Sequence, residues 1–376
     1  MASHALDHPA VVPSTRLVSL DVFRGLTMAA MVIVNNPGDW SHVYPPLLHA
    51  EWHGWTPTDL IFPFFLFIVG VSITLSRKSA SWSSILRRSA IIFALGLFLS
   101  GYPHFDLSRW RIPGVLQRIA ICYLFAAAAF RVTSGDRRRQ GITLAVVACA
   151  ISLAYWMVMA LVPAPGGMAG DLSPGGNLGA WLDRALMSGH LWRPTWDPEG
   201  LLSTMPAIAT TLLGTSAGLW LGSAETPERK AAGLLAGGIA CLIAGQIWHE
   251  VFPINKNLWT SSYVMFTAGG AAVLLAACYW AIDVKGWRGW TTPFVVLGTN
   301  AITLFVFSGL LVETLGLIRV AAPDGRDVSV SRFIYLEYFT PLASPKNASL
   351  LYALANLVVL FGLLAWMYRR RMFLRV

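Results

Sequence analysis

The chain has 376 residues, of which 55% are hydrophobic and only 12% are charged. Soluble globular domains carry about 25% charged residues, so the composition excludes an ordinary soluble domain. The apolar residues also fall in long blocks, and we therefore predict an all-α, polytopic integral membrane protein.

Ten apolar blocks approach the length of about 20 residues that a helix needs to cross the ~30 Å hydrocarbon core of a bilayer. In chain order they lie near residues 17–36, 58–76, 85–101, 113–131, 141–162, 200–222, 231–249, 260–282, 292–317 and 347–368. No internal repeat or soluble domain interrupts them, and no separate apolar signal segment precedes Arg16. We expect a short cytoplasmic tail over residues 1–15 and a single transmembrane domain over residues 16–376, whose first span stays uncleaved.

Lys and Arg residues set the orientation of these spans, because cytoplasmic loops of membrane proteins are enriched in them. With the N-terminus in the cytoplasm, seventeen of the 28 Lys and Arg residues fall in cytoplasmic segments, nine fall outside, and Arg24 and Arg118 lie within spans. Both termini are therefore predicted to be cytoplasmic. The net charge of +9 follows mostly from this asymmetry, so no nucleic-acid partner is predicted. The seventeen residues are Arg16, Arg77, Lys78, Arg87, Arg88, Arg131, Arg137, Arg138, Arg139, Arg229, Lys230, Lys285, Arg288, Arg369, Arg370, Arg371 and Arg375.

The four cysteines lie singly inside predicted spans, without a Cys-x-x-Cys pair or a loop cysteine. The sequence therefore predicts neither a disulfide nor a thiolate metal site, and no metal is assigned to the chain. The cysteines are Cys122, Cys149, Cys241 and Cys278.

Polar residues lie at both ends of the first span. Asp21 and Arg24, in the stretch SLDVFRG, are three residues apart on one helix face, so a structural ion pair is one interpretation. Asn35 and Asn36 follow at the outer end, just before Pro37. Because polar side chains within a membrane tend to face a cavity or a partner, these positions are candidates for a functional site.

The loop between the first two spans, about residues 37–57, contains no Lys or Arg but is rich in His, Trp and acidic residues. His49 has apolar neighbours, which predicts a partly buried ring, and a structural histidine is the alternative. Asp59 is expected in the first turn of the second span, where the helix dipole favours a negative charge, so a helix cap is its alternative role. The tryptophans are typical of the aromatic belt at a membrane interface.

Three later spans also carry polar residues at their outer ends. We expect these ends to converge with those of the first two spans around a polar cavity that runs through the bundle, although periodicity alone does not show convergence. The residues are Arg111, Gln117 and Arg118 at the fourth span, Asp197 and Glu199 at the sixth, and Asn255, Lys256, Asn257 and Trp259 at the eighth.

Five motifs follow one another along the chain: SLDVFRGLTMAAMVIVNN, LLHAEWHGWTPTDLIFPFFLFIVG, RIPGVLQRIAICY, WDPEGLLSTMPAIATTLLG and NKNLWTSSYV. In this order they resemble the membrane domain of heparan-α-glucosaminide N-acetyltransferase and its bacterial NagX-like relatives, and the resemblance runs from about Arg16 to the C-terminus. The lysosomal member of the family carries an extra N-terminal lumenal region and an additional helix. Because the chain lacks both, the resemblance implies a multi-pass protein of a bacterial inner membrane.

The resemblance implies an acetyl-CoA-dependent N-acetyltransferase, which moves an acetyl group from cytosolic acetyl-CoA to the amine of a glucosamine-type amino sugar on the periplasmic side. It implies His49, in LLHAEW, as the active-site residue and Asn35, in IVNN, as a second catalytic-site residue. Glu51 and His53 are additions to the motif of the family, and the resemblance assigns them no role.

The chemistry of acyl transfer to an amine is consistent with these roles. The reaction needs a base for the amine proton and a donor for the developing oxyanion. His49 can act as the base or as a nucleophile that briefly carries the acetyl group, and Asn35 offers an amide N–H to the carbonyl oxygen. Asp59 or Glu51 would orient the imidazole, and we favour Asp59 because it starts the helix that follows His49.

The anionic head of acetyl-CoA needs cations at the cytoplasmic mouth of the cavity. Arg24 is the first candidate, followed by Arg87 and Arg88, although the positive-inside rule alone also explains such residues. The sequence contains no phosphate-binding glycine fingerprint of the P-loop or dinucleotide type after a strand. Candidate contacts for the amino-sugar acceptor are Glu51, Trp52, Arg118, Asp197, Glu199, Asn255, Lys256, Asn257 and Trp259.

The main alternative function is a transporter or exporter of a sugar-like solute without acyl transfer. Transporters more often show paired halves with broken helices, and the sequence shows no such pairing. A structural or sensory membrane protein is a third alternative, but it leaves the grouping of His49, Asp59 and Asn35 unexplained. The sequence leaves open the identity of the acceptor, an acetyl-histidine intermediate against a ternary complex, and the oligomeric state, for which a homodimer is one alternative.

Overall fold

Helices make up nearly all of the regular structure in the computed structural model, which describes residues 17–76, 81–322 and 325–374. The predicted tail over residues 1–15 and the cations Arg16, Arg77, Lys78 and Arg375 lie outside the described residues. The helices are α1 (Val18–Asn35), α2 (Ile61–Leu75), α3 (Trp82–Gly101), α4 (Val115–Val132), α5 (Arg137–Leu161), α6 (Leu178–Met187), α7 (Leu201–Leu221), α8 (Pro227–His249), α9 (Ser261–Tyr279), α10 (Thr292–Thr299), α11 (Ala301–Leu317), α12 (Val330–Ile334) and α13 (Pro345–Arg369).

Short elements complete the described chain. The 3-10 segments η1 (Pro45–Leu47) and η2 (Pro57–Leu60) precede α2, and the π segments η4 (Trp280–Val284) and η5 (Tyr335–Phe339) follow α9 and α12. Strands β1 (Arg319–Ala321) and β2 (Asp327–Ser329) form one antiparallel hairpin, in which Val320 lies opposite Val328.

The prediction of an all-α polytopic membrane protein is confirmed. Within the described residues, eight helices are long and apolar enough to cross a membrane, and α10 with α11 forms a ninth candidate. The remaining predicted span, near 200–222, coincides with α7, which has 21 residues, contains several Thr, Ser and Gly residues and is not among these candidates. All ten predicted spans therefore have a helix or a helix pair at their position.

Helix α7 runs through the interior of the bundle, where it contacts α2, α4, α5 and α9. Its threonines are buried, and each hydroxyl donates a hydrogen bond to a carbonyl of the preceding turn, as Thr211 does to Ala207. Two glycines bring α2 and α7 together: a Cβ at Gly70 would lie 2.0 Å from the Thr211 carbonyl oxygen, and one at Gly214 would lie 2.1 Å from that of Phe67. Small side chains at this crossing allow the two backbones to touch.

The predicted span at 292–317 corresponds to two helices, α10 and α11, which meet at an angle of 79°. Asn300 interrupts the helix with φ −122° and ψ 39°. Its side chain bonds to the segment after α13: the carboxamide oxygen accepts from the Leu374 backbone N–H at 3.2 Å, and the amide donates to the Met372 carbonyl at 3.3 Å. Tertiary contacts from the C-terminal segment therefore accompany a bend that local hydropathy does not reveal.

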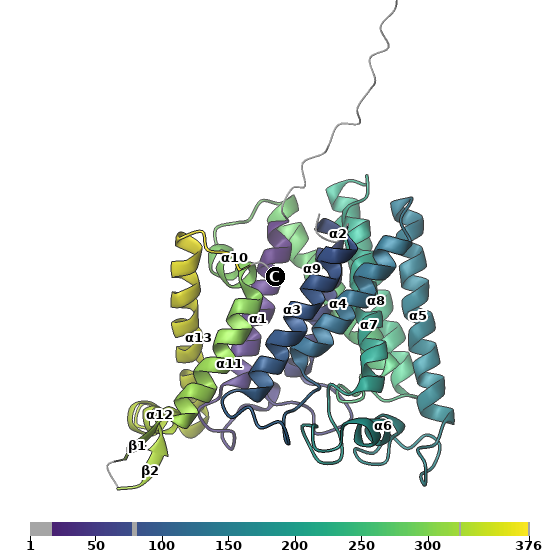
Figure 1. Cartoon of the computed structure of the whole chain (residues 1–376). Helices are drawn as coiled ribbons and strands as arrows, with labels where there is room; N and C mark the ends of the chain where they lie inside the picture. The colour runs from purple at the N-terminus through teal and green to yellow at the C-terminus, as the bar shows by residue number, and fades with distance from the viewer. Residues whose placement is uncertain (1–16, 77–80, 323–324, 375–376) are drawn as a thin grey trace, which may run out of the picture.

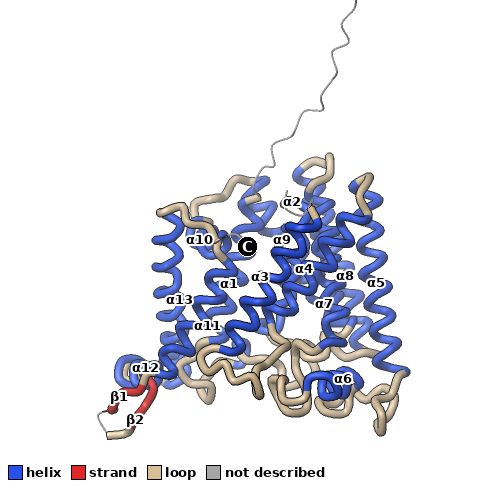
Figure 2. Tube along the Cα trace, in the orientation of Figure 1, coloured by secondary structure: helices blue, strands red, loops and turns tan. Residues whose placement is uncertain are grey.

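The two ends of the bundle differ in structure. Figure 1 shows α6, α12 and the β1–β2 hairpin gathered at the end opposite the start of α1. In Figure 2 much of the loop structure collects at this same end, including the loops around α6. With the predicted cytoplasmic N-terminus, this loop-rich end is the outer face, and we use that term below.

Candidate active site

His49 and Asp59 form the centre of the site at the outer face. The Nδ1 atom of His49 lies 2.6 Å from Oδ1 of Asp59. The Oδ2 atom of Asp59 accepts hydrogen bonds from the backbone N–H groups of Ala50 and Thr56, both at 3.0 Å, and from the Thr56 hydroxyl at 3.1 Å. These donors favour the ionised carboxylate, which is an acceptor for an Nδ1–H of His49 and leaves Nε2 as the ring nitrogen that does not face Asp59.

The carboxylate of Asp59 makes both a helix cap and the contact with His49. Thr56 and Asp59 form a capping box at the start of η2, which continues into α2. Asp59 is 1% exposed, whereas the side chain of His49 is 48% exposed. The helix cap therefore holds the carboxylate in place, and the histidine bonded to it remains accessible to solvent.

A cavity opens beside His49 and extends into the membrane-spanning part of the bundle. It holds about 690 Å³ of empty space, part of which is open to solvent. Its polar lining includes Asn35, His49, Thr58, Glu199 and Lys256 near the outer face, and its walls come from α1, α2, α4 and α11. The lining also contains Met28, Met31, Val34, Ile61, Phe62, Phe65, Val115, Leu116, Ile119, Ile302 and Phe305.

This lining differs from the polar cavity that the sequence predicts. Most wall residues are apolar, and polar residues concentrate at the outer end. On α1 the lining reaches Thr27, which lies one helical turn from Arg24. The polar ends of the spans do converge, therefore, but around the mouth of an apolar cavity.

The two asparagines at the end of α1 have different surroundings. Asn36 is buried, and its amide donates to the Val32 carbonyl at 2.6 Å and to the Ser308 hydroxyl at 3.3 Å. Asn35 is exposed and lines the cavity together with His49. Of the two, Asn35 has its amide available to a bound molecule.

Lys256 joins the same group, although the sequence suggests only a role in acceptor binding. Its Nζ lies 3.1 Å from each ring nitrogen of His49 and 3.9 Å from Oδ1 of Asp59. Burial lowers the pKa of Lys256, the carboxylates of Asp59 and Glu199 oppose this effect, and the nearby Arg118 adds to it, with a net lowering. The ammonium is therefore placed directly beside the imidazole.

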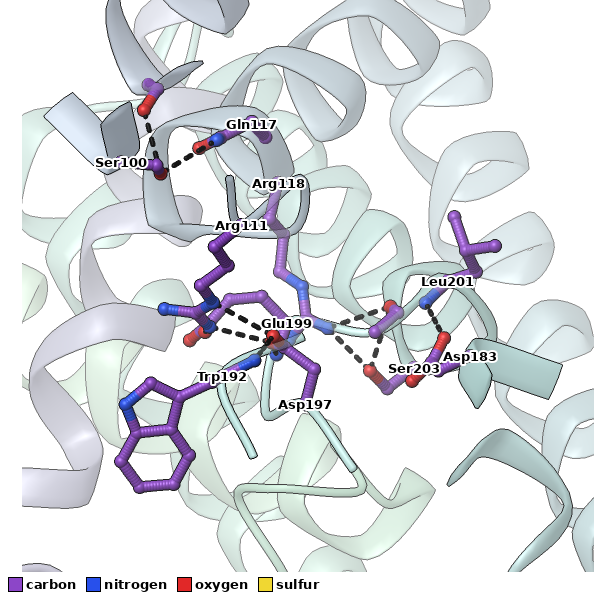
Figure 3. Close-up of polar contacts among 12 residues, drawn as sticks. Ser100, Arg111, Gln117, Arg118, Asp183, Trp192, Asp197, Glu199, Leu201 and Ser203 are labelled. Carbon is purple, nitrogen blue, oxygen red and sulfur yellow. Dashed lines mark hydrogen bonds and ion pairs between the residues drawn. The ribbon is translucent and has the colours of Figure 1, made fainter. Parts of the chain in front are cut away.

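A second charged group, drawn in Figure 3, adjoins the cavity through Glu199, which is part of the lining. The guanidinium of Arg111 makes two bonds to Asp197, at 2.8 and 2.6 Å, and one to Glu199 at 2.5 Å. Asp197 also accepts from the backbone N–H groups of Trp192, at 2.7 Å, and Glu199, at 2.9 Å. Burial lowers the pKa of Arg111, but the two carboxylates more than offset this and hold the pKa above its usual value.

Arg118 lies deeper and is 1% exposed. One of its nitrogens, Nη2, donates to the Gly200 carbonyl at 3.1 Å and to the Ser203 hydroxyl at 2.5 Å. Its guanidinium also lies 5.0 Å from the ring centroid of Trp259, which is itself 1% exposed. Both residues were acceptor-contact candidates in the sequence, and the structure buries both beneath the site.

The remaining acceptor candidates have three different environments. Asn255 is fully buried and shapes its own loop by accepting from the Leu258 backbone N–H at 2.9 Å. Trp52 and Asn257 line a smaller polar pocket beside the cavity, together with Asp197. Glu51 is exposed and is absent from the lining of either pocket.

Sequence reasoning missed the roles of two charged residues. Arg111 appeared only as a residue near the fourth span, yet opposite charges just before two spans were a usable signal for its pairing with Asp197. Asp183 on α6 accepts from the Leu201 backbone N–H at 2.9 Å and thereby caps α7. Burial raises the pKa of Asp183 to about 6. No sequence pattern links α6 to the start of α7.

The three arginine candidates for the coenzyme head lie away from the outer face, on α1 and α3. Arg24 bonds to Asp21 at 3.1 Å, to the Gly298 carbonyl at 3.2 Å and to the Ser72 hydroxyl at 2.8 Å. The guanidinium of Arg88 lies 4.7 Å from the ring centroid of Tyr123, and Arg87 is exposed. The expected pairing of Arg24 with Asp21 is present.

Comparisons with known proteins point to one family. Residues 16–164, which include Asn35, His49 and Asp59, match the family model described as heparan-α-glucosaminide N-acetyltransferase, catalytic. The heparan-α-glucosaminide N-acetyltransferase of Homo sapiens is 32% identical over 356 residues, covering 77% of this chain and 52% of the relative. The Mus musculus protein of the same name is 31% identical over 356 residues, covering 78% and 53%. The chain spans about half the length of these relatives, and it belongs to a heparan-α-glucosaminide N-acetyltransferase-like family.

Proposed function

We propose that this chain is a transmembrane N-acetyltransferase, which transfers the acetyl group of cytosolic acetyl-CoA to the amine of an amino sugar on the periplasmic side of a bacterial inner membrane. The observation that carries the proposal is the His49–Asp59 pair, 2.6 Å apart, at the outer mouth of a deep apolar cavity. The relatives support acetyl transfer through their names, which specify an α-glucosaminide acceptor for those proteins.

In direct transfer, His49 is the general base. Its Nε2 removes a proton from the acceptor amine as the nitrogen bonds to the thioester carbon. The carbon–sulfur bond then breaks, and the thiolate of coenzyme A takes the proton back from the imidazolium. Asp59 stabilises the imidazolium through Nδ1, and the Asn35 amide donates to the carbonyl oxygen.

In the covalent route, Nε2 of His49 attacks the thioester carbon itself and expels the thiolate. The acceptor amine then attacks the acetyl-imidazole, and the imidazole leaves. The surroundings of His49 suit both routes, because each needs an unprotonated Nε2 that faces the cavity. The two routes differ in whether label from acetyl-CoA stays on the protein when no acceptor is present.

The apolar walls of the cavity suit the slender acetyl-pantetheine arm of acetyl-CoA, which must reach the outer face from the cytosol. The anionic nucleotide would then lie toward the cytoplasmic end, where Arg24, Arg87 and Arg88 are its candidate cationic partners.

In the proposed enzyme, residues 16–376 form a single membrane domain in the lipid bilayer, and residues 1–15 form a cytoplasmic tail. The acceptor side of the site consists of Glu199 and Lys256 at the cavity, with Trp52, Asp197 and Asn257 beside it. The acceptor itself is glucosamine, an amino sugar derived from the cell wall, or another exported amine or hydroxyl compound. The protein acts alone or as a homodimer.

A transporter without acyl transfer remains the second candidate, and one observation favours it. The 79° bend between α10 and α11 is the kind of broken helix that transporters use at substrate sites. However, the described residues contain one such bent pair, whereas transporters with inverted repeats place broken helices in both halves.

Mass spectrometry of amino sugars tests the proposal. Detergent-purified protein is incubated with acetyl-CoA and glucosamine, and the acetylated product is measured for wild type and for His49→Ala. We expect product from wild type and a fall of about 10²–10⁴-fold in the variant, since base catalysis contributes this much. His104→Ala, in an exposed outer loop, is the matched control and keeps its activity. Full activity of His49→Ala would refute the proposed site.

A further inference from the structure

Lys256 has surroundings that acceptor binding does not explain. Its Nζ is 3.1 Å from both Nδ1 and Nε2 of His49, so it lies beside the ring and not along the lone pair of either nitrogen. The nearest carboxylate oxygen, Oδ1 of Asp59, is 3.9 Å away, beyond hydrogen-bond distance. The ammonium is thus held close to the reacting nitrogen without being bound tightly to a carboxylate.

We propose that Lys256 is a further catalytic residue, whose ammonium stabilises the negative charge that develops on the carbonyl oxygen of the acetyl group. This inference rests on the proposed acyl transfer at His49. An acetyl group that reacts at Nε2 lies within a few ångströms of Nζ, because Nζ is 3.1 Å from Nε2. Lys256 and Asn35 also line the same cavity.

The bonds and charges balance without a change in Lys256. As the acceptor nitrogen bonds to the carbonyl carbon, the π electrons of the C=O bond move to oxygen, and the ammonium faces the resulting oxyanion. When the C=O bond re-forms, the carbon–sulfur bond breaks and the thiolate leaves. The amine proton passes through Nε2 of His49 to the thiolate, and Lys256 keeps its own protons throughout.

The surrounding charges explain why this position needs a cation. Two carboxylates lie near the cavity mouth. Glu199 lines the cavity, and Asp59 lies beside Lys256, which also lines it. Arg111 bonds to Glu199, and Arg118 is buried beneath the site. Without Lys256, an oxyanion would form beside the carboxylate of Asp59 with no cation in contact with His49. Such a charge beside a carboxylate is disfavoured, because like charges repel each other.

Steady-state kinetics of purified protein test this role. In Lys256→Met we expect kcat for glucosamine acetylation to fall by about 10²–10³-fold, the loss typical of removing one oxyanion donor. The affinity for acetyl-CoA is expected to stay within threefold of wild type, since the cation acts on the transition state. Lys346→Met, which removes an exposed outer-face lysine, is the matched control and keeps wild-type kcat.

The pH profile separates catalysis from a structural role of Lys256. Burial, together with Arg118, lowers the pKa of Lys256 despite the opposing carboxylates of Asp59 and Glu199. Wild-type kcat should therefore fall as pH rises through this lowered value, because the ammonium loses its charge. Lys256→Arg keeps its charge, so its alkaline limb moves to higher pH while kcat at pH 7 stays within about tenfold of wild type. This variant also carries the test if Lys256→Met does not fold.

The outcomes distinguish this inference from the proposed function. If His49→Ala loses activity while Lys256→Met stays within fivefold of wild type, the role of Lys256 is overturned and the function stands. An unchanged alkaline limb in Lys256→Arg overturns it in the same way. If wild type acetylates no amine, the function and the inference fall together.

Discussion

Charged side chains are stabilised differently at the outer face and in the inner half of the bundle, the end at which α1 starts. At the outer face, loop backbone donates to buried carboxylates: Ala50 and Thr56 donate to Asp59, and Trp192 donates to Asp197. A helix interior has no such donors to spare, because its N–H groups already bond within the helix. The cavity walls between helices are accordingly apolar. Charged side chains therefore gather at the ends of the spans, where loop backbone N–H groups can donate hydrogen bonds to them.

The pair of His49 and Asp59 forms the centre of the site at the outer face, and its removal should have the largest effect on kcat. In Asp59→Asn the carboxamide no longer provides a charged acceptor for Nδ1–H and cannot stabilise an imidazolium. We expect kcat for amino-sugar acetylation to fall by about 10²–10⁴-fold. Asp39→Asn, in the same loop, is the control. Near wild-type kcat in Asp59→Asn would leave Asp59 with only its helix-cap role.

The Arg111 ion pairs should matter for stability more than for chemistry. Arg111→Met leaves Asp197 and Glu199 without their cation, and breaking a buried pair costs about 3–5 kcal/mol. Because the Arg111 side chain is 26% exposed, we expect a loss of about 3 kcal/mol in the free energy of unfolding. Titration with a denaturing detergent measures it, with the exposed Arg193→Met as control. Equal stability of the two variants would contradict the network shown in Figure 3.

Ionisation of Asp183, at the outer face, should make the free energy of unfolding depend on pH. Because its pKa is raised to about 6 from the usual 3.8, the folded protein binds a proton between these values that the unfolded chain does not. The free energy of unfolding therefore falls as pH rises from about 4 to 6, and the contribution stays lost above that.

Replacing Asp183 tests this sign. Asp183→Asn keeps an acceptor for the Leu201 N–H but cannot ionise. We expect it to raise the free energy of unfolding at pH 7.5 by at most about 3 kcal/mol, from a shift of about two units, and to change it little at pH 4. Detergent titrations at the two pH values measure the difference. A gain of the same size at both pH values would show that ionisation of Asp183 is not its source.

Much of this comparison was available from the sequence, for identifiable reasons. Hydropathy placed the spans, because a helix in lipid must be apolar over its whole length. The closeness of His49 and Asp59 followed from their separation of ten residues around a helix start. Asp59 also carried a cap signal, and the structure shows that the cap and the contact with His49 are the same carboxylate.

Other features depend on contacts between distant segments and could not be read locally. Lys256 reaches His49 across 207 residues, and Asp183 caps a helix 18 residues away. The bend at Asn300 involves hydrogen bonds to residues more than 70 positions later. The apolar lining of the cavity was also hidden, since the residues that line a cavity and those that face lipid are equally apolar.

The crossing of α2 and α7 brings two helix backbones into contact, and a methyl group should disturb it. In Gly70→Ala the added Cβ would lie 2.0 Å from the Thr211 carbonyl oxygen, so the helices must separate. We expect a loss of about 1–3 kcal/mol in the free energy of unfolding, as for other overpacked sites. Gly237→Ala is the matched control, because a Cβ there meets nothing within 4 Å. A loss of equal size in Gly237→Ala would trace the effect to helix propensity or lipid contact.

The smallest expected effect belongs to the inner half, where Arg24 bonds to Asp21, Ser72 and the Gly298 carbonyl. If Arg24 also contacts the phosphates of acetyl-CoA, Arg24→Ala removes a partly desolvated cation and raises the Kd for acetyl-CoA about tenfold, since a charge-assisted bond contributes about 1.5–3 kcal/mol. Binding to purified protein measures it, with Arg229→Ala as the control, because the Arg229 side chain is 75% exposed.

The alternative for Arg24 has its own signature. A purely structural pair with Asp21 would leave the Kd unchanged and lower the free energy of unfolding, because the partner carboxylate would lose its cation within the bundle. A raised Kd in Arg24→Ala would mean that the inner half also binds a charged group, the phosphates of acetyl-CoA. An unchanged Kd with a lower free energy of unfolding would give Arg24 a structural role only. The candidate phosphate contacts would then be Arg87 and Arg88 on α3, and the guanidinium of Arg88 lies against the ring of Tyr123.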